Sequence, residues 1–295
     1  MAGGLDHLVV VARDLDAQAE LYRRLGFQVG ARNRHAWGTL NHIVQFDGSF
    51  LELLTTEESF QRPPIGAPVG LFVDTVVDYL EAREGLAMMV LEGHDADADH
   101  RAFNAAGIGA PETFYFARQG YRPDGGAVEV AFSLAFAKAA GVEDAGLFVC
   151  QQHAPEMFWN KSFQMHENGA TGIARIGFAS PAPHNHADFF AAYTGCAPAD
   201  VEGGLRFQLA RGAVDVLTPA HCAGLFGASA LPESLDTPRF AAIEFHVEDS
   251  ARIVAKLLES DMPYEEIGGR VVVPARAAMG VTLAFSGATK AKDLG

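Results

Sequence analysis

The chain has 295 residues, 49% hydrophobic and 20% charged, a globular composition sufficient for one large or two ordinary domains. Its net charge of -15 disfavours nucleic-acid and membrane-surface partners, because an acidic surface repels phosphate groups and anionic lipid. Three widely spaced cysteines, a start unlike a signal peptide and no apolar run of membrane length lead us to expect a soluble cytoplasmic protein.

The first residues predict a βαβββ unit. Leu5–Ala12 is a Val-rich apolar run typical of a buried strand. Asp14 can cap the helix that follows, and Gly26 can end it. Three further strands are expected, at residues 28–31, 40–46 and 50–54.

The same unit recurs along the chain. A shift of 81 residues aligns Leu5 with Leu86, Asp14 with Asp95 and Gly26 with Gly107. Shifts of 169 and 235 residues align two further strand–helix patterns. We therefore predict an α+β fold of four βαβββ modules, at about 5–55, 86–153, 172–219 and 240–287, paired into an N-terminal domain (1–170) and a C-terminal domain (171–295). A short helix over 73–83 is expected in the first link.

Two motifs carry a family resemblance. Paired βαβββ units that begin with Leu-Asp-His and carry Glu on the last strand resemble the vicinal-oxygen-chelate superfamily. RHAWGTLNHIVQFDGSFLELL (34–54) and CQQHAPEMFWN (150–160) are similar to glyoxalase-like domain proteins. The resemblance implies open barrel-like clefts, which often hold one divalent metal bound by the first and last strands of each paired unit. It implies no substrate, because the superfamily includes isomerases, dioxygenases, epimerases, resistance enzymes and metal-free binding proteins.

His7 on the first strand and Glu52 on the last are the leading candidates for chemistry. A carboxylate within FLELL needs a partner, because burying a lone charge is costly; a metal or a structural Arg would serve. In the second unit, aligning Gly48 with Gly146 places Cys150 opposite Glu52, with Gln152 on the same face. A slip of one residue would instead bring in Gln151 and His153.

Other residues are expected around the cleft. Met88 stands where His7 falls in the second unit, and Met does not suit a hard or borderline metal. Asn41 and His42 can hydrogen-bond a substrate carbonyl, and aromatic side chains can line a cavity or simply form core. The candidate set is Glu52 and His42 as catalytic residues; Asn41, Trp37, Phe116 and Gln152 as substrate-binding residues; and His7, Glu52 and His153 as metal ligands.

The resemblance implies a divalent-metal-dependent enzyme using Fe, Mn, Zn, Ni or Co. The expected chemistry is that of a lyase, an isomerase or a ring-cleaving dioxygenase acting on a small oxygenated molecule. An aromatic cavity lining would suit a planar or aromatic substrate. The missing second-unit histidine keeps open the alternative of a metal-free binding or resistance protein. In the second half, Asp215 falls where Glu52 sits but no histidine accompanies it, so no metal is expected there. A small-molecule substrate and a monomer or homodimer are the expected partners and assembly.

Overall fold

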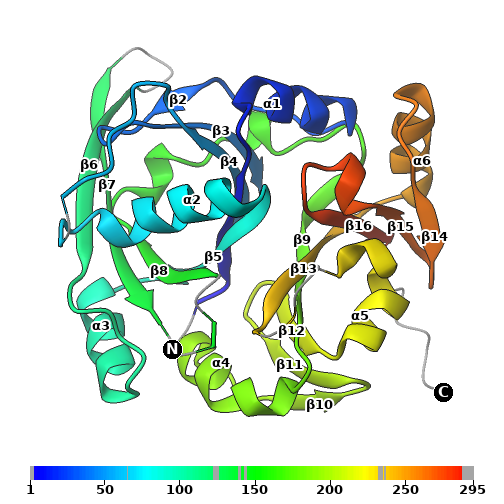
Figure 1. The fold of residues 1–295 in the computed structure, drawn as a ribbon. Helices are drawn as coiled ribbons and strands as arrows, with labels where there is room; N and C mark the ends of the chain where they lie inside the picture. The colour runs from blue at the N-terminus through cyan, green and yellow to red at the C-terminus, as the bar shows by residue number, and fades with distance from the viewer. Residues whose placement is uncertain are drawn as a thin grey trace.

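A computed structural model describes residues 3–64, 66–121, 126–138, 141–142, 145–231, 235 and 237–287. The βαβββ order occurs four times along the chain, and the modules pair within two curled eight-stranded sheets (Figure 1). The predicted α+β fold of four paired modules is confirmed.

The first sheet joins two modules at its centre. In sheet order its strands are β2 (Asn33–Arg34), β3 (Thr39–Phe46), β4 (Ser49–Thr56), β1 (Leu5–Val11), β5 (Gly85–Gly93), β8 (Gly146–Gln152), β7 (Ala127–Ala137) and β6 (Phe114–Tyr121). Strand β1 runs parallel to β4 and antiparallel to β5. The helices of this first half are α1 (Leu15–Arg24), α2 (Gly70–Ala82) and α3 (Ala96–Ala105).

The second sheet repeats this arrangement. Its order is β10 (Ala199–Val201), β11 (Gly204–Gln208), β12 (Ala213–Leu217), β9 (Ala170–Ala179), β13 (Arg239–Val247), β16 (Thr282–Gly287), β15 (Arg270–Val273) and β14 (Glu265–Ile267). Its helices are α4 (Ala187–Thr194), α5 (Pro219–Phe226) and α6 (Ser250–Glu259). Short 3₁₀ turns are η1 (Pro155–Met157), η2 (Lys161–Phe163), η3 (Pro183–His186), η4 (Ala228–Ala230) and η5 (Ala275–Ala277).

Local chemistry explains where the repeated helices begin. The Asp14 carboxylate accepts the Ala17 N–H at 2.9 Å, and the Asp95 carboxylate accepts the Ala98 N–H at the same distance. Each bond satisfies a donor that the first turn leaves free. Gly26 follows α1 with φ of 82°, a left-handed conformation that favours glycine.

Two predicted elements differ from the structure. The strand expected at 28–31 is wrong, since β2 is the two-residue strand Asn33–Arg34. The backbone at Gln28 instead donates to the His166 side chain, a tertiary contact that local patterns do not reveal. The helix expected over 73–83 begins earlier, at Gly70, as α2.

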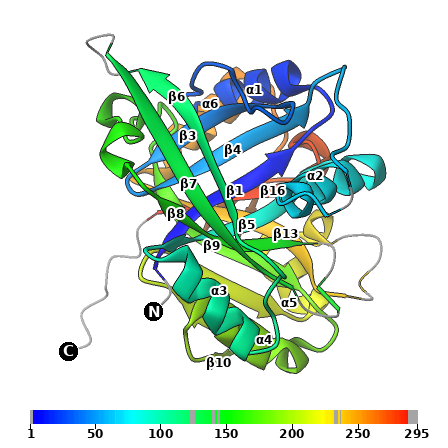
Figure 2. The ribbon, with the colours of Figure 1, turned by 90° about the vertical axis from the view of Figure 1, so that its left-hand side faces the viewer.

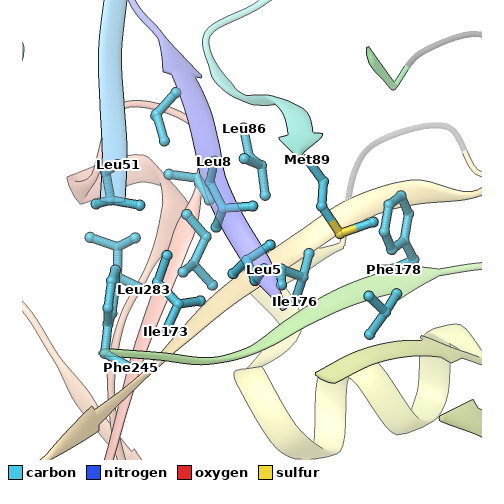
Figure 3. Packing of buried hydrophobic residues seen from close by; sticks show 14 of the residues in the cluster. Leu5, Leu8, Leu51, Leu86, Met89, Ile173, Ile176, Phe178, Phe245 and Leu283 are labelled. Carbon is cyan, nitrogen blue, oxygen red and sulfur yellow. The ribbon is translucent and has the colours of Figure 1, made fainter. Parts of the chain in front are cut away.

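A shared core joins the two sheets. Leu8 and Leu51 of the first sheet face Ile173, Phe245 and Leu283 of the second, and all are buried (Figure 3). Helices pair across the same junction: α3 and α4 lie side by side, as do α1 and α6 (Figures 1 and 2). The two halves are therefore held together by apolar burial over a broad contact.

Each curled sheet holds one helix against its concave face. In the first sheet, α2 contributes Phe72, Val73 and Val76 to a second core cluster, which also contains Val9 and Val90 (Figure 1). Helix α5 takes the corresponding position in the second sheet. Within the described residues, no helix combines the length and apolar character needed to cross a membrane.

Candidate active site

A cavity opens on the concave face of the first sheet, beside α2. Its volume is about 60 Å³, and it is partly open to solvent. It is lined by His7, His35, Trp37, Asn41, Ile43, Phe50, Glu52, Phe72, Phe116, Phe132, Leu134, Phe148, Cys150 and Phe158.

A bulge in β1 places an acid beside His7. The pairing of β1 with β5 shifts register between Leu5 and His7, so the strict alternation of side chains is interrupted at Asp6. The Asp6 carboxylate accepts from His7 Nδ1 at 2.6 Å and from Gln152 Nε2 at 2.7 Å. Because Nδ1 carries this proton, a neutral His7 ring leaves Nε2 unprotonated.

Glu52 is held by polar neighbours from the segment before it. Asn41 Nδ2 donates to Glu52 Oε1, and His35 Nε2 lies 3.8 Å from the same oxygen. His35 Nδ1 is in turn 2.8 Å from Thr39 Oγ1. Glu52 is 6% exposed, so these contacts offset only part of the cost of burying a carboxylate.

Aromatic rings form most of the remaining wall. The His7 ring stacks on Phe50, with centroids 4.3 Å apart, and His35 stacks on Trp37 at 4.5 Å. Phe116 meets Trp37 edge to face at 4.9 Å. Such a wall favours a planar ligand, because ring faces and edges can pack on both of its sides.

The register of β8 is now defined. Cys150 lines the cavity and Gln152 contacts Asp6, while Gln151 turns away and accepts the Ala96 N–H. Burial raises the pKa of the Cys150 thiol well above its usual range, and the charges of Asp6 and Glu52 add to the effect. A thiol held in its protonated form is a poor nucleophile and a poor metal ligand.

Two candidate residues lie away from the cavity. His153 is exposed at the end of β8, with Nε2 2.8 Å from Ser133 Oγ. His42 points to the opposite face of β3 from Asn41, and its Nδ1 donates to the Gly30 carbonyl at 2.7 Å. The structure thus brings His7, Glu52, Asn41, Trp37 and Phe116 together around the cavity, with Gln152 behind Asp6, but not His42 or His153.

Two residues of the site were not predicted from the sequence. The Leu-Asp-His pattern places an acid next to His7, but adjacent side chains of a regular strand point to opposite faces, so it predicts no contact between them. Phe72 carries no local signal, because α2 reaches the cavity through tertiary packing.

Two buried polar atoms of the wall have no hydrogen-bond partner within the described residues. They are Trp37 Nε1, a donor, and Asn41 Oδ1, an acceptor. Unpaired buried groups are costly and uncommon in native proteins. Their presence beside a cavity is what a site built to hydrogen-bond a ligand would show.

In the second sheet, the buried carboxylates are paired with arginines. Asp215, the counterpart of Glu52, accepts two hydrogen bonds from Arg206 at 2.7 and 2.8 Å. Glu244 accepts one from Arg270 at 2.9 Å. Among the residues described, Glu52 has no such arginine, so its charge remains directed at the cavity.

The donor set does not match a three-ligand metal centre. His7 and Glu52 supply two donors from neighbouring strands. From the second unit, Cys150 lines the cavity. The counterpart of His7 there is Val90, not the expected Met88. The pairing of His7 with Phe50 in the first unit corresponds to the pairing of Val90 with Phe148 in the second. No group of three or more His, Cys, Asp or Glu side chains able to hold a metal occurs in the described part of the chain.

Comparisons with solved structures give the fold a wider context. A hypothetical protein from Staphylococcus aureus is 11% identical, with a TM-score of 0.65 over 97% of this chain and 99% of that one. A mutant 4-hydroxymandelate synthase from Streptomyces coelicolor is 13% identical, with a TM-score of 0.60 over 100% and 95%. A Mn(II)-bound glyoxalase from Novosphingobium aromaticivorans is 12% identical, with a TM-score of 0.52 over 97% and 83%. Identities this low establish the fold alone.

No curated protein matches the chain. A family match does extend over the whole first sheet, its cavity and the start of the second sheet. Residues 5–194, well over half of the chain, match the Glyoxalase-like domain. The chain therefore belongs to the family of glyoxalase-like domain proteins.

Proposed function

We propose that the chain is an enzyme that transfers a proton on a small, planar, oxygenated molecule bound in the first-sheet cavity. The observation that carries the proposal is the pair of buried acidic groups there, Asp6 with His7 and Glu52 with Asn41. Among the described residues, neither has an arginine partner of the kind that neutralises Asp215 and Glu244. Buried ionisable groups of this kind cluster at functional sites.

The Asp6–His7 pair supplies the acid–base group. Asp6 fixes the ring so that Nε2 is the free nitrogen and stabilises the charge that forms when Nε2 takes a proton. Glu52, on the adjacent parallel strand and the same face, offers a second proton acceptor two residues further along. The aromatic wall orients a flat substrate.

A divalent-metal enzyme of the same fold is the second candidate. The Nδ1–H of His7 donates a hydrogen bond to the Asp6 carboxylate, and metal-ligating histidines are usually oriented by such a bond. The residues present do not complete a three-ligand set, so we assign no step to a metal.

Deuterium exchange tests the first candidate. A panel of aromatic ketones and hydroxyketones is incubated with the protein in D₂O, and deuterium gain at carbon next to the carbonyl is followed by NMR. We expect exchange that falls roughly 100-fold or more in His7→Gln and in Asp6→Asn, because the amide introduced by the second substitution would turn the ring proton onto Nε2.

Metal content separates the two candidates. Protein purified without chelator is assayed for Fe, Mn, Zn, Ni and Co and tested with and without each added ion. Exchange that needs no metal, and substoichiometric metal in the pure protein, support the acid–base proposal. Stoichiometric metal that leaves with His7→Gln, together with exchange that requires it, would replace it with the metal enzyme.

A further inference from the structure

We infer that the cavity selects a positively charged ligand, a small aromatic molecule that carries a protonated amino group and a nearby oxygen. The inference rests on the proposed function and names the ligand class of the same cavity. Three features carry it: an aromatic cage, an acidic interior, and two unpaired polar atoms of opposite kind.

The cage is formed by rings from four parts of the first sheet. Trp37 precedes β3, Phe50 lies on β4, Phe116 on β6 and Phe158 follows β8. Faces of aromatic rings attract cations, Trp most strongly, and the attraction grows when water is excluded. A ring-bearing ammonium ion can use both its flat surface and its charge in such a cage.

The interior is acidic. Glu52 lines the cavity and Asp6 lies behind His7, whereas none of the described lining residues is Lys or Arg. Burial raises the pKa of the Cys150 thiol most, and the two carboxylates raise it further, because like charges repel. A carboxylate-bearing ligand would meet repulsion, and an ammonium group would meet a counter-charge.

The unpaired atoms define the polar groups of the ligand. Asn41 Oδ1 has no donor among the described residues, while the Asn41 amide nitrogen donates to Glu52. An ammonium N–H can donate to this oxygen and to the Glu52 carboxylate. In the described part of the chain Trp37 Nε1 has no acceptor, and a hydroxyl or carbonyl oxygen of the ligand can supply one.

A matched series of ring compounds tests the inference. Benzylamine, benzyl alcohol and benzoate share a ring and differ in charge, and their binding to the full-length chain at neutral pH is measured by titration calorimetry. We expect benzylamine to bind about tenfold more tightly than benzyl alcohol, with benzoate weakest. Benzylamine binding no more tightly than the alcohol overturns the inference but leaves the cavity as a binding site.

Variants locate the source of the selectivity. Glu52→Gln keeps the size of the side chain and removes its charge, so benzylamine should fall to the affinity of benzyl alcohol. Glu58→Gln removes an equal charge from an exposed position and should leave the tenfold preference intact. A preference that persists in Glu52→Gln contradicts the inference, and so does a wild-type protein that binds none of the three compounds. Deuterium exchange on the ketone panel decides the proposed function separately. If Glu52→Gln does not fold, the wild-type ranking still decides.

Discussion

At the scale of single residues, the treatment of buried charge distinguishes the two halves of the chain. Glu52 and Asp215 stand at corresponding places, yet Arg206 neutralises Asp215 while Glu52 meets Asn41 and His35. The sequence predicted Glu52 because a carboxylate in an apolar strand needs a partner. It could not place Asp6 beside His7, because that contact depends on a bulge that breaks the alternation of side chains.

A buried histidine makes stability depend on pH. His166 is 4% exposed; its Nδ1 accepts from the Gln28 N–H at 3.0 Å, and its Nε2 donates to the Gln45 carbonyl at 2.9 Å. Burial lowers the pKa of His166 from 6.5 to about 4, against the opposing effect of the Gln45 carbonyl. Above pH 6.5 the ring is neutral in both states; between 6.5 and 4 only the unfolded chain takes the proton, so stability falls as the pH falls.

The expected loss through His166 is about 3 kcal/mol between pH 7 and pH 4. Urea unfolding at several pH values measures it as the difference between wild type and His166→Gln, in which a non-titrating amide replaces the imidazole. His184→Gln, at an exposed position, is the control and should keep the wild-type pH dependence. Equal pH slopes for wild type and His166→Gln would contradict the assignment.

At the scale of elements, one loop closes the cavity. Gln45 on β3 fixes the segment after β8, because its Nε2 donates to the Phe158 carbonyl at 2.9 Å and its Oε1 accepts the Asn160 N–H at 3.0 Å. Phe158 lines the cavity, and its ring centroid lies 4.9 Å from that of Phe50. The strands and helices of each module were predictable from local pattern, but this closure was not, because it joins residues more than a hundred positions apart.

Removing the loop anchor should loosen the cavity wall. In Gln45→Leu both hydrogen bonds are lost, so we expect faster amide hydrogen exchange at Asn160 and severalfold weaker ligand binding. Gln208→Leu, at an exposed site on the second sheet, is the matched control. Unchanged exchange at Asn160 in Gln45→Leu would show that the loop is held by other contacts.

At the scale of the whole molecule, the two sheets behave as one packed body. Phe245 of β13 is fully buried. Its ring centroid lies 5.1 Å from that of Phe27 and 5.8 Å from that of Phe46, both in the first half. The module repeat and the family resemblance predicted the two sheets, because each module carries its own hydrophobic pattern. How the sheets dock could not be predicted, since it depends on complementary faces distant in sequence.

This docking predicts coupled unfolding. Phe245→Ala should cost about 3–5 kcal/mol through the cavity it leaves. Both tryptophans, Trp37 and Trp159, lie in the first half, so their fluorescence reports on the sheet that does not contain the mutation. We expect their unfolding midpoint to shift together with that of far-UV circular dichroism, whereas Phe163→Ala, at an exposed ring, should shift neither. A tryptophan transition that stays in place would mean that the halves unfold independently.

We propose the first-sheet cavity, rather than the corresponding place on the second sheet, as the functional site. A crystal structure of the full chain soaked with benzylamine tests it most directly. We expect to find the ring between Trp37 and Phe50, with the amino group within hydrogen-bond distance of Glu52 or Asn41. A ligand bound at the second sheet beside Asp215, with the first-sheet cavity left empty, would contradict it.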